Sequence, residues 1–391
     1  MIPQVITAPI AKVASGFREA FDVCVSKTRR NLPDLAESQR TWSFAPNGDY
    51  PQWNEGFFEI GNWTTSFFTG MGVLAWLDTG DNQFVSDLAL SEPNYFAKME
   101  GENARETMHD LGFLYSLYSV ALHKATGEAH HRELGLRAAR VLAGRFVPQG
   151  NYIRAWGRMD EPNTDYAGLA IIDCMMNLPL LFWASKESGN PSFREIAIRH
   201  ADTTLANFIR EDGSVYHAFR FRPDGQPDCG DNYCGNTIES HWARGSTWAM
   251  YGFALAYRHT GDERYLDASL RVTRKFISLL DDEIVPLWDF QLAAGMPPLR
   301  DSSAAAIAAC AIQELEGLGK AEPAMTHAKD SLLARLLSPD YFDTDPACRG
   351  VLKQGEVGDG VGKAKSAYTS WGDYYFMEAL GRELGLTVNW W

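Results

Sequence analysis

The sequence predicts an all-α fold in which six helical hairpins close into a ring, an (α/α)6 barrel. Three observations carry this prediction. Apolar residues recur at helical spacing through most of the chain, a Thr-Gly or Ser-Gly pair recurs between helical runs, and 391 residues match about six such hairpins. No linker rich in proline or serine interrupts the chain, so we expect residues 1–391 to form a single domain.

Helical spacing is clearest in three stretches that place apolar residues on one face of a helix. Their members are Leu111, Leu114, Tyr115, Tyr118 and Leu122; Trp248, Tyr251, Gly252, Leu255 and Ala256; and, more loosely, Ala304, Ala308, Ile312 and Leu315. No convincing series of alternating strand residues is evident. We therefore expect the chain to be helical nearly throughout.

The repeated pair marks the turn inside each hairpin. It occurs at Thr79–Gly80, Thr126–Gly127, Ser188–Gly189 and Thr260–Gly261. Glycine fits the position just after a helix, where a left-handed backbone is needed. The spacing between these glycines is 47, 62 and 72 residues, so each hairpin carries a loop of different length. A closed ring fits these unequal units better than a linear solenoid does, and we interpret residues 223–237 as a long functional loop.

Charge and composition exclude several classes of function. The chain has 36 basic and 50 acidic residues, a net charge of −14, which disfavours nucleic acid as a partner. It contains no run of about 18 apolar residues, so we expect no membrane span. Residues 1–17 do not resemble a signal peptide, and the six cysteines are scattered, so we expect reduced thiols in a cytoplasmic protein.

Carboxylates remain as the candidate catalytic groups of this chain. The chain has no phosphate-binding loop, dinucleotide fingerprint, zinc-protease motif or serine-hydrolase elbow, and its nine histidines are dispersed without metal spacing. We therefore expect neither a metal nor a cofactor. The 12 tryptophans and 15 tyrosines exceed the usual need of a core, and together with acid–base carboxylates they suggest carbohydrate as the ligand.

Two aspartates stand out by their surroundings. Asp173 lies among isoleucine, methionine and leucine, where a carboxyl must be paired or protonated, and its pKa rises toward that of a general acid. A purely structural buried aspartate is an equally good reading of the same residues. Asp110 begins an apolar helix, and the simple alternative is a carboxylate stabilised by the helix dipole.

A third cluster joins Arg244 to Trp248, four residues apart on one helix face. An arginine beside a tryptophan can bind a carboxylate while the ring covers a sugar face, although an arginine stem packed on a core tryptophan has the same spacing. His217 can donate to a substrate or serve as a structural loop histidine.

Six segments taken together resemble the unsaturated glucuronyl hydrolases, glycoside hydrolase family 88. They are Asn62–Gly70, His109–Tyr115, Ile171–Ala184, Trp242–Phe253, Asp301–Ala309 and Ser370–Leu380, in family order. The resemblance implies an (α/α)6 barrel that acts on small oligosaccharides carrying a 4,5-unsaturated uronic acid. It implies that Asp173 is the general acid and base and Asp110 the second essential carboxylate. Substrate-binding positions would be Trp63, His109, Trp156, His217, Arg244, Trp248 and Ser370.

The family's reaction gives each residue an expected role. Asp173 would protonate C4 of the vinyl ether and activate the water that adds at C5, after which the ring opens and the aglycone leaves. Asp110 would hold ring hydroxyls and stabilise positive charge, Arg244 and His217 would face the anionic sugar, and Trp156 and Trp248 would stack on sugar rings.

The chain departs from the family pattern at Ser246, where glutamine is common, and in the loop at residues 229–240. Lys363, Lys365 and Ser366 could read a sulfate or carboxylate, or form a solvated basic loop. The competing readings are an unsaturated rhamnogalacturonyl hydrolase, a sugar epimerase and a non-catalytic carbohydrate-binding protein.

Overall fold

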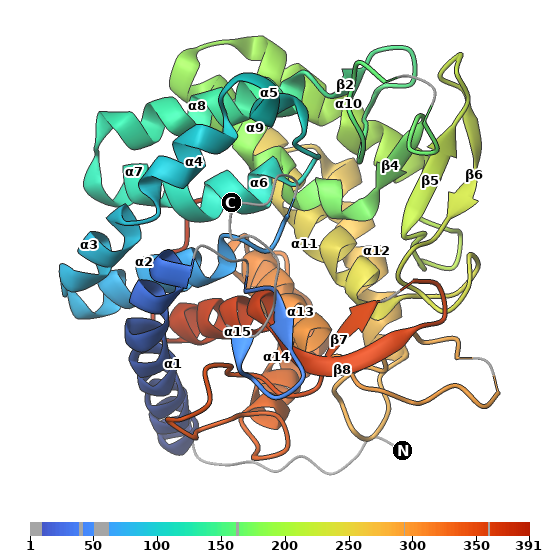
Figure 1. Ribbon diagram of the computed structural model, residues 1–391. Coiled ribbons are helices and arrows are strands. Elements are labelled where there is room, and N and C mark those ends of the chain that lie inside the picture. The colour runs from blue at the N-terminus through green and yellow to red at the C-terminus, as the bar shows by residue number, and fades with distance from the viewer. Residues whose placement is uncertain (1–9, 39–41, 51–61, 162–163, 293, 359) are drawn as a thin grey trace.

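The computed structural model describes residues 10–38, 42–50, 62–161, 164–292, 294–358 and 360–391 (Figure 1). Residues 1–9, the start of the segment compared above with signal peptides, lie outside the described residues. No helix in the described ranges is both long and apolar enough to cross a membrane.

A ring of inner helices forms the centre of the molecule. Its members are α2 (Phe67–Thr79), the continuous run α6–η2–α7 (Leu111–Tyr115, Ser116–Val120 and Ala121–Thr126), α9 (Leu178–Ser188), α11 (Ala243–Thr260), α13 (Ser302–Gly317) and α15 (Ser370–Glu383). Each contacts the next, and α15 contacts α2, which closes the ring. A π-helical turn, η2, separates α6 from α7, and a 3-10 turn, η3 (Ile172–Met176), precedes α9.

Outer helices pack against the inner ring. They are α1 (Ile10–Ser38) against α2 and α15, α3 (Gln83–Ala89) against α2, α8 (Ala129–Ala143) against α6–α7, α10 (Pro191–Asn207) against α9, α12 (Glu263–Ser278) against α11 and α14 (Pro323–Leu336) against α13. Two short helices, α4 (Glu92–Lys98) and α5 (Gly101–Arg105), follow α3. Within the described ranges this double ring confirms the predicted (α/α)6 barrel (Figure 1).

The repeated Thr/Ser-Gly pair ends inner helices, as predicted. Gly80, Gly127, Gly189 and Gly261 all adopt left-handed backbone angles, with φ between 68° and 78°. The hydroxyl before each glycine donates to a carbonyl one turn back, as Thr260 does to Ala256 over 2.7 Å, and accepts the N–H two residues on, as from Asp262 over 3.2 Å. One small motif therefore ends an inner helix and starts the return to an outer one.

Short strands are the feature that helical spacing did not predict. The described residues form three antiparallel sheets, in the orders β1-β8-β7, β2-β3 and β4-β5-β6. Their bounds are β1 Phe44–Ala45, β2 Phe146–Val147, β3 Tyr152–Ile153, β4 Leu169–Ile171, β5 Ala218–Phe221, β6 Pro227–Asp231, β7 Gly355–Gly358 and β8 Ala364–Thr369. Strands of two to six residues are too short to show a two-residue period in sequence.

Aromatic rings pack together inside the barrel. Trp63 lies 4.8 Å from Trp371 between ring centroids, and Phe113 lies 5.2 Å from Trp248. Rings this close bury a large apolar area and fix one another by edge and face contacts. The barrel interior is thus a packed aromatic core at the N-terminal ends of the inner helices.

Candidate active site

Asp173 lies in the first turn of η3, immediately after β4. Strand β4 pairs with β5, and the N–H of Ile172 continues the ladder by donating to the carbonyl of His217 over 2.9 Å. This pairing brings the Asp173 carboxylate to 3.9 Å from Nε2 of His217. Burial raises the pKa of Asp173 to about 7, against an opposing effect of the Arg244 charge. Asp173 therefore has the raised pKa that the sequence predicted for a general acid.

His217 has a defined tautomer because its Nδ1 is an acceptor. The backbone N–H groups of Tyr233 and Cys234 donate to Nδ1 over 3.0 and 3.3 Å. Burial lowers the pKa of His217 to about 3, so the ring is neutral and its single proton is on Nε2, facing Asp173. His217 thus holds a loop with Nδ1 and turns Nε2 toward Asp173, and its expected donation to a substrate stays a prediction.

Asp110 occupies the position before α6 without capping it through its side chain. Its carboxylate lies 3.4 Å from Nε2 of His109, which is itself buried. Burial, and next the negative charge of Asp173, raise the pKa of Asp110 well above its usual range. Burial and the charge of Asp173 therefore both act against ionisation of Asp110, and its expected role in stabilising positive charge stays a prediction.

Asn177 connects the two segments that carry Asp110 and Asp173. Its side-chain Oδ1 accepts the N–H of Phe113 over 2.8 Å, and its Nδ2 donates to the carbonyl of Asp173 over 3.2 Å. Its amide also counteracts the raised pKa of Asp110 by hydrogen bonding. One buried amide therefore ties the start of α6, which carries Asp110, to the turn that carries Asp173.

Arg145 is a buried cation that sequence reasoning missed. Its guanidinium donates to four backbone carbonyls: Thr107 over 2.5 Å, Arg154 over 2.9 Å, Ala155 over 3.2 Å and Gly157 over 2.9 Å. These carbonyls flank His109 and Trp156, so one side chain fixes the two segments that carry those residues. Its charge also works against the raised pKa of Asp110.

Arg244 is a buried cation held by two carboxylates. Its Nη1 donates to Asp301 over 2.8 Å and to Glu356 over 3.0 Å, and the guanidinium lies over the rings of Trp242 and Trp371. Both carboxylates are fully buried. Two acids therefore hold Nη1 of Arg244, and its expected place facing the anionic sugar stays a prediction.

The expected aromatic residues divide into two groups. Trp63 and Trp156 are partly exposed, so a sugar could reach their rings, and their role as surfaces for sugar stays a prediction. Trp248 is 0% exposed, so the prediction that it stacks on a sugar ring is wrong in this structure. Its ring packs edge to face against Trp63, with the ring centroids 6.4 Å apart. Ser370 begins α15 fully buried, and its hydroxyl has no partner among the described residues.

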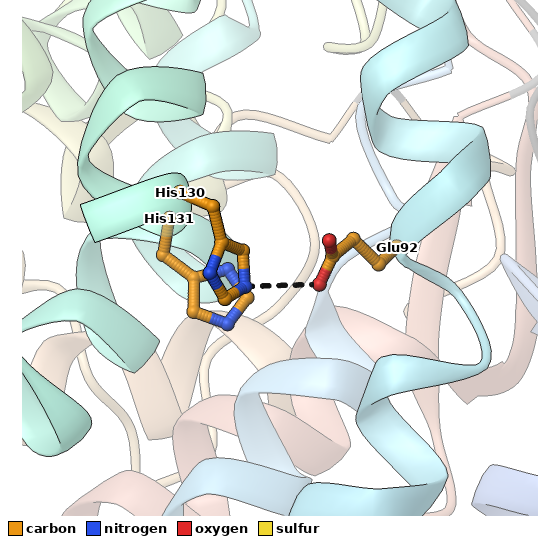
Figure 2. A group of neighbouring side chains, drawn as sticks. All are labelled: Glu92, His130 and His131. Atoms are coloured by element: carbon orange, nitrogen blue, oxygen red, sulfur yellow. Dashed lines mark hydrogen bonds and ion pairs between the residues drawn. The ribbon is translucent and has the colours of Figure 1, made fainter. Parts of the chain in front are cut away.

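A separate cluster of histidines lies on outer helices. Glu92 on α4 and His130 on α8 are 3.1 Å apart, and the ring of His131 lies 4.0 Å from that of His130 (Figure 2). These three side chains could together hold a cation. They belong to the outer layer of the barrel, whereas Asp110 and Asp173 belong to the inner ring, so the cluster is separate from the carboxylate site.

Comparison with known proteins places this arrangement in a defined group. The model of the family described as Glycosyl Hydrolase Family 88 matches residues 34–378. The unsaturated glucuronyl hydrolase of Bacillus sp. (strain GL1) is 35% identical over 336 residues, covering 84% of this chain and 88% of that protein. The unsaturated chondroitin disaccharide hydrolase of Streptococcus pneumoniae is 36% identical over 329 residues, covering 82% and 81%.

A solved structure agrees with the fold. The crystal structure of unsaturated glucuronyl hydrolase from Bacillus sp. GL1, described as responsible for the degradation of glycosaminoglycan, matches with a TM-score of 0.85 at 32% identity. The match covers 94% of this chain and 96% of that chain. The resemblance expected from six sequence segments is thereby confirmed over almost the whole length.

Proposed function

Because this chain belongs to Glycosyl Hydrolase Family 88, we propose that it removes a 4,5-unsaturated uronic acid from the non-reducing end of small oligosaccharides, with Asp173 as acid and base. Such sugars are the products of polysaccharide lyases. The relatives named above act on unsaturated glucuronyl and unsaturated chondroitin substrates, which supports this substrate class. The observation that carries the proposal is the Asp173 carboxyl, 16% exposed and with a pKa of about 7, beside the neutral His217.

The reaction is the hydration of a vinyl ether. The Asp173 carboxyl gives its proton to C4, which leaves positive charge shared by C5 and the ring oxygen. The carboxylate then takes a proton from water as the water oxygen bonds to C5. The hemiketal opens to a ketone at C5, the former ring oxygen becomes a hydroxyl on C1, and C1 releases the aglycone as an alcohol. One water is consumed and Asp173 regains its proton.

The substrate itself helps to protonate Asp173. A uronate brings a negative charge to the site, and a like charge raises the pKa of a nearby carboxyl. Asp173 therefore carries its proton in the complex at neutral pH. Asp110, whose pKa is raised by burial and by the charge of Asp173, holds a ring hydroxyl in this proposal.

Helix termini add to the positive potential of the site. Asp110, Arg244 and Ser370 stand at the N-terminal ends of the inner helices α6, α11 and α15. The N-terminal end of a helix carries a partial positive charge and favours anions. Several inner helices thus present their positive ends to one uronate, in a protein whose net charge is −14.

Loss of ultraviolet absorbance from the conjugated C=C–COO⁻ group measures the activity directly. We expect the purified protein to remove this absorbance from at least one unsaturated disaccharide derived from chondroitin, hyaluronan, heparin, gellan or ulvan. Asp173→Asn should abolish the reaction while the circular dichroism spectrum stays unchanged. Absorbance that persists with every disaccharide contradicts the proposed activity, and an active Asp173→Asn variant contradicts the role of that residue.

The protein's location is part of the same proposal. The six free cysteines, of which Cys24, Cys174 and Cys310 are buried, support a reducing cytoplasmic environment in which imported oligosaccharides are cleaved. Cell fractionation with an antibody to the protein tests this.

A further inference from the structure

Three side chains with metal-ligand atoms meet where the outer helices α4 and α8 come together (Figure 2). Glu92 begins α4, and His130 and His131 lie in the first turn of α8. One ligand atom of each side chain lies within 4.8 Å of those of the other two. Glu92 precedes His130 by 38 positions, so the spacing of histidines in the sequence did not indicate this cluster.

The two kinds of donor in the cluster suit a divalent transition metal. Imidazole nitrogen and carboxylate oxygen are common ligands of Zn²⁺, and imidazole also suits Ni²⁺ and Cu²⁺. Ligand atoms about 2.1 Å from a tetrahedral zinc ion lie roughly 3.4 Å from one another. Nε2 of His130 is 3.1 Å from the Glu92 carboxylate, so these two groups already have nearly that spacing.

The ring of His131 has a buried nitrogen that nothing in the described part of the chain satisfies. The residue is 5% exposed, and its Nδ1 has no hydrogen-bond partner there. Buried polar atoms in proteins nearly always have a partner, so an unpaired one beside two further donors indicates a ligand from outside the chain.

The charges around the two rings favour a cation. Glu128, the residue before α8, adds a second carboxylate, 3.5 Å from Nε2 of His130 and 3.7 Å from Nε2 of His131. Within the described ranges, no lysine or arginine forms an ion pair with Glu92 or Glu128. Two carboxylates therefore face two imidazoles without a permanent positive charge between them, and a divalent ion would supply it.

The base of the cluster is fixed before any ion binds. Tyr95 of α4 stacks on Tyr118 of η2, with ring centroids 3.8 Å apart, and His131 meets the Tyr118 ring edge to face at 5.7 Å. The Tyr118 hydroxyl donates to the carbonyl of Leu88 over 3.0 Å. One buried ring of the inner layer thus holds both helices that carry ligands, and groups already in place lose little conformational entropy on binding.

We propose that Glu92, His130 and His131 bind a divalent transition metal ion such as Zn²⁺, which ties α4 to α8 and stabilises the outer layer of the barrel. A further oxygen, from Glu128 or water, would complete the tetrahedral set. The site is separate from Asp110 and Asp173, so this inference does not depend on the proposed function.

Calorimetric titration of the full chain with Zn²⁺ tests the site. The protein is prepared without an affinity tag and dialysed against EDTA and then metal-free buffer. We expect one Zn²⁺ per chain, with Kd at least roughly 10-fold higher in Glu92→Gln and in His130→Ala. These side chains are 28% and 43% exposed, so their replacement leaves the core intact. The matched control is His327→Ala, an exposed histidine of α14, which should keep the native Kd.

Thermal unfolding gives an independent readout. With Zn²⁺ at about 100 times Kd, Tm of the native protein and of His327→Ala should rise by roughly 2–4 °C, because the ion binds the folded state. Tm of Glu92→Gln and of His130→Ala should not rise.

Three results would overturn the proposal. If the native protein takes up no Zn²⁺, the cluster is an ordinary hydrogen bond between Glu92 and His130. If the variants bind with the native Kd, the ion lies elsewhere. If uptake is lost in Cys229→Ser instead, the exposed thiol of Cys229 is the ligand.

Discussion

Gly112 lies so close to Asn177 that a Cβ on the glycine would stand 2.2 Å from the Cα of Asn177 and 2.7 Å from its carbonyl oxygen. The atoms in the way belong to the backbone, so no rotation of a side chain can relieve the clash. The start of α6 can therefore approach η3 only because residue 112 has no side chain. This approach brings the start of α6, which Asp110 precedes, against the end of η3, which carries Asp173.

Gly112→Ala should push the two carboxylates apart. Forcing extra volume into a packed site typically costs about 1–3 kcal/mol, and a misplaced reacting group can lower kcat by roughly 100-fold. We expect lower Tm and a larger loss in kcat than in substrate affinity. Gly317→Ala, in a helical position where no atom lies within 4 Å of the added Cβ, is the control and should retain activity. Normal kcat in Gly112→Ala would show that the close approach is unimportant.

The two nitrogens of His217 can be tested separately. Asn at this position can still accept from the N–H groups of Tyr233 and Cys234, but it cannot reach Asp173. Gln can reach toward Asp173 but does not replace the Nδ1 acceptor. We expect His217→Asn to keep Tm while kcat falls roughly 10- to 100-fold, and His217→Gln to lose Tm because two buried donors lose their partner. If both variants behave alike, the two nitrogens do not have separate roles.

Glu356 should influence the pH at which the enzyme works. Its carboxyl, buried and with a pKa raised to about 7, helps Asp301 to neutralise Arg244. The Arg244 charge lowers the pKa of Asp173, and the thiol of Cys234 and the neutral His217 also lie near these groups. Glu356→Gln keeps the hydrogen bonds but removes one negative charge, so Arg244 acts on Asp173 more strongly.

The sign of the expected change follows from the role of Asp173. The reaction needs Asp173 protonated, so activity falls as pH rises through its pKa. Because Glu356→Gln lowers that pKa, the alkaline limb of the kcat–pH profile should move to lower pH. Glu239→Gln, on a side chain that is 73% exposed, should leave the profile unchanged. A shift to higher pH in Glu356→Gln would contradict this coupling.

Arg145→Met should destabilise the protein and the site together. It leaves four backbone carbonyls without their donor, and each buried acceptor left unpaired costs about 1–3 kcal/mol. We expect a free energy of unfolding lower by about 3 kcal/mol or more, measured by urea denaturation, with Arg145→Lys intermediate because lysine reaches fewer of the carbonyls. Arg222→Met removes an exposed ion pair and should change stability little. Equal stability of the Met and native proteins would exclude this role of Arg145.

Local sequence was sufficient to predict the turns and the raised pKa of Asp173. The Thr/Ser-Gly pairs act through hydrogen bonds within four residues, so the local sequence is enough to identify these turns. Asp173 was recognisable because its sequence neighbours are also its spatial neighbours.

Long-range pairing was not predictable in the same way. Glu356 meets Arg244 across 112 positions, and nothing near either residue indicates the other. Arg145 was missed because its partners are carbonyls, which every residue has. The burial of Trp248 was not predicted. The sequence shows which residues share a helix face, but only the neighbouring helices determine whether that face is covered or exposed.

The hydroxyl-and-glycine turns separate the two rims of the barrel. On one rim, inner helices end in the short turn that the Thr/Ser-Gly pair forms. On the other rim, where the inner helices begin, the connections are long and of unequal length, and they carry Asp110, Asp173 and the sheet β4-β5-β6. The ring can therefore accept new loops on the second rim while the first keeps the hairpins in register. This makes the barrel a scaffold on which loops can be grafted to select another sugar without rebuilding the helices.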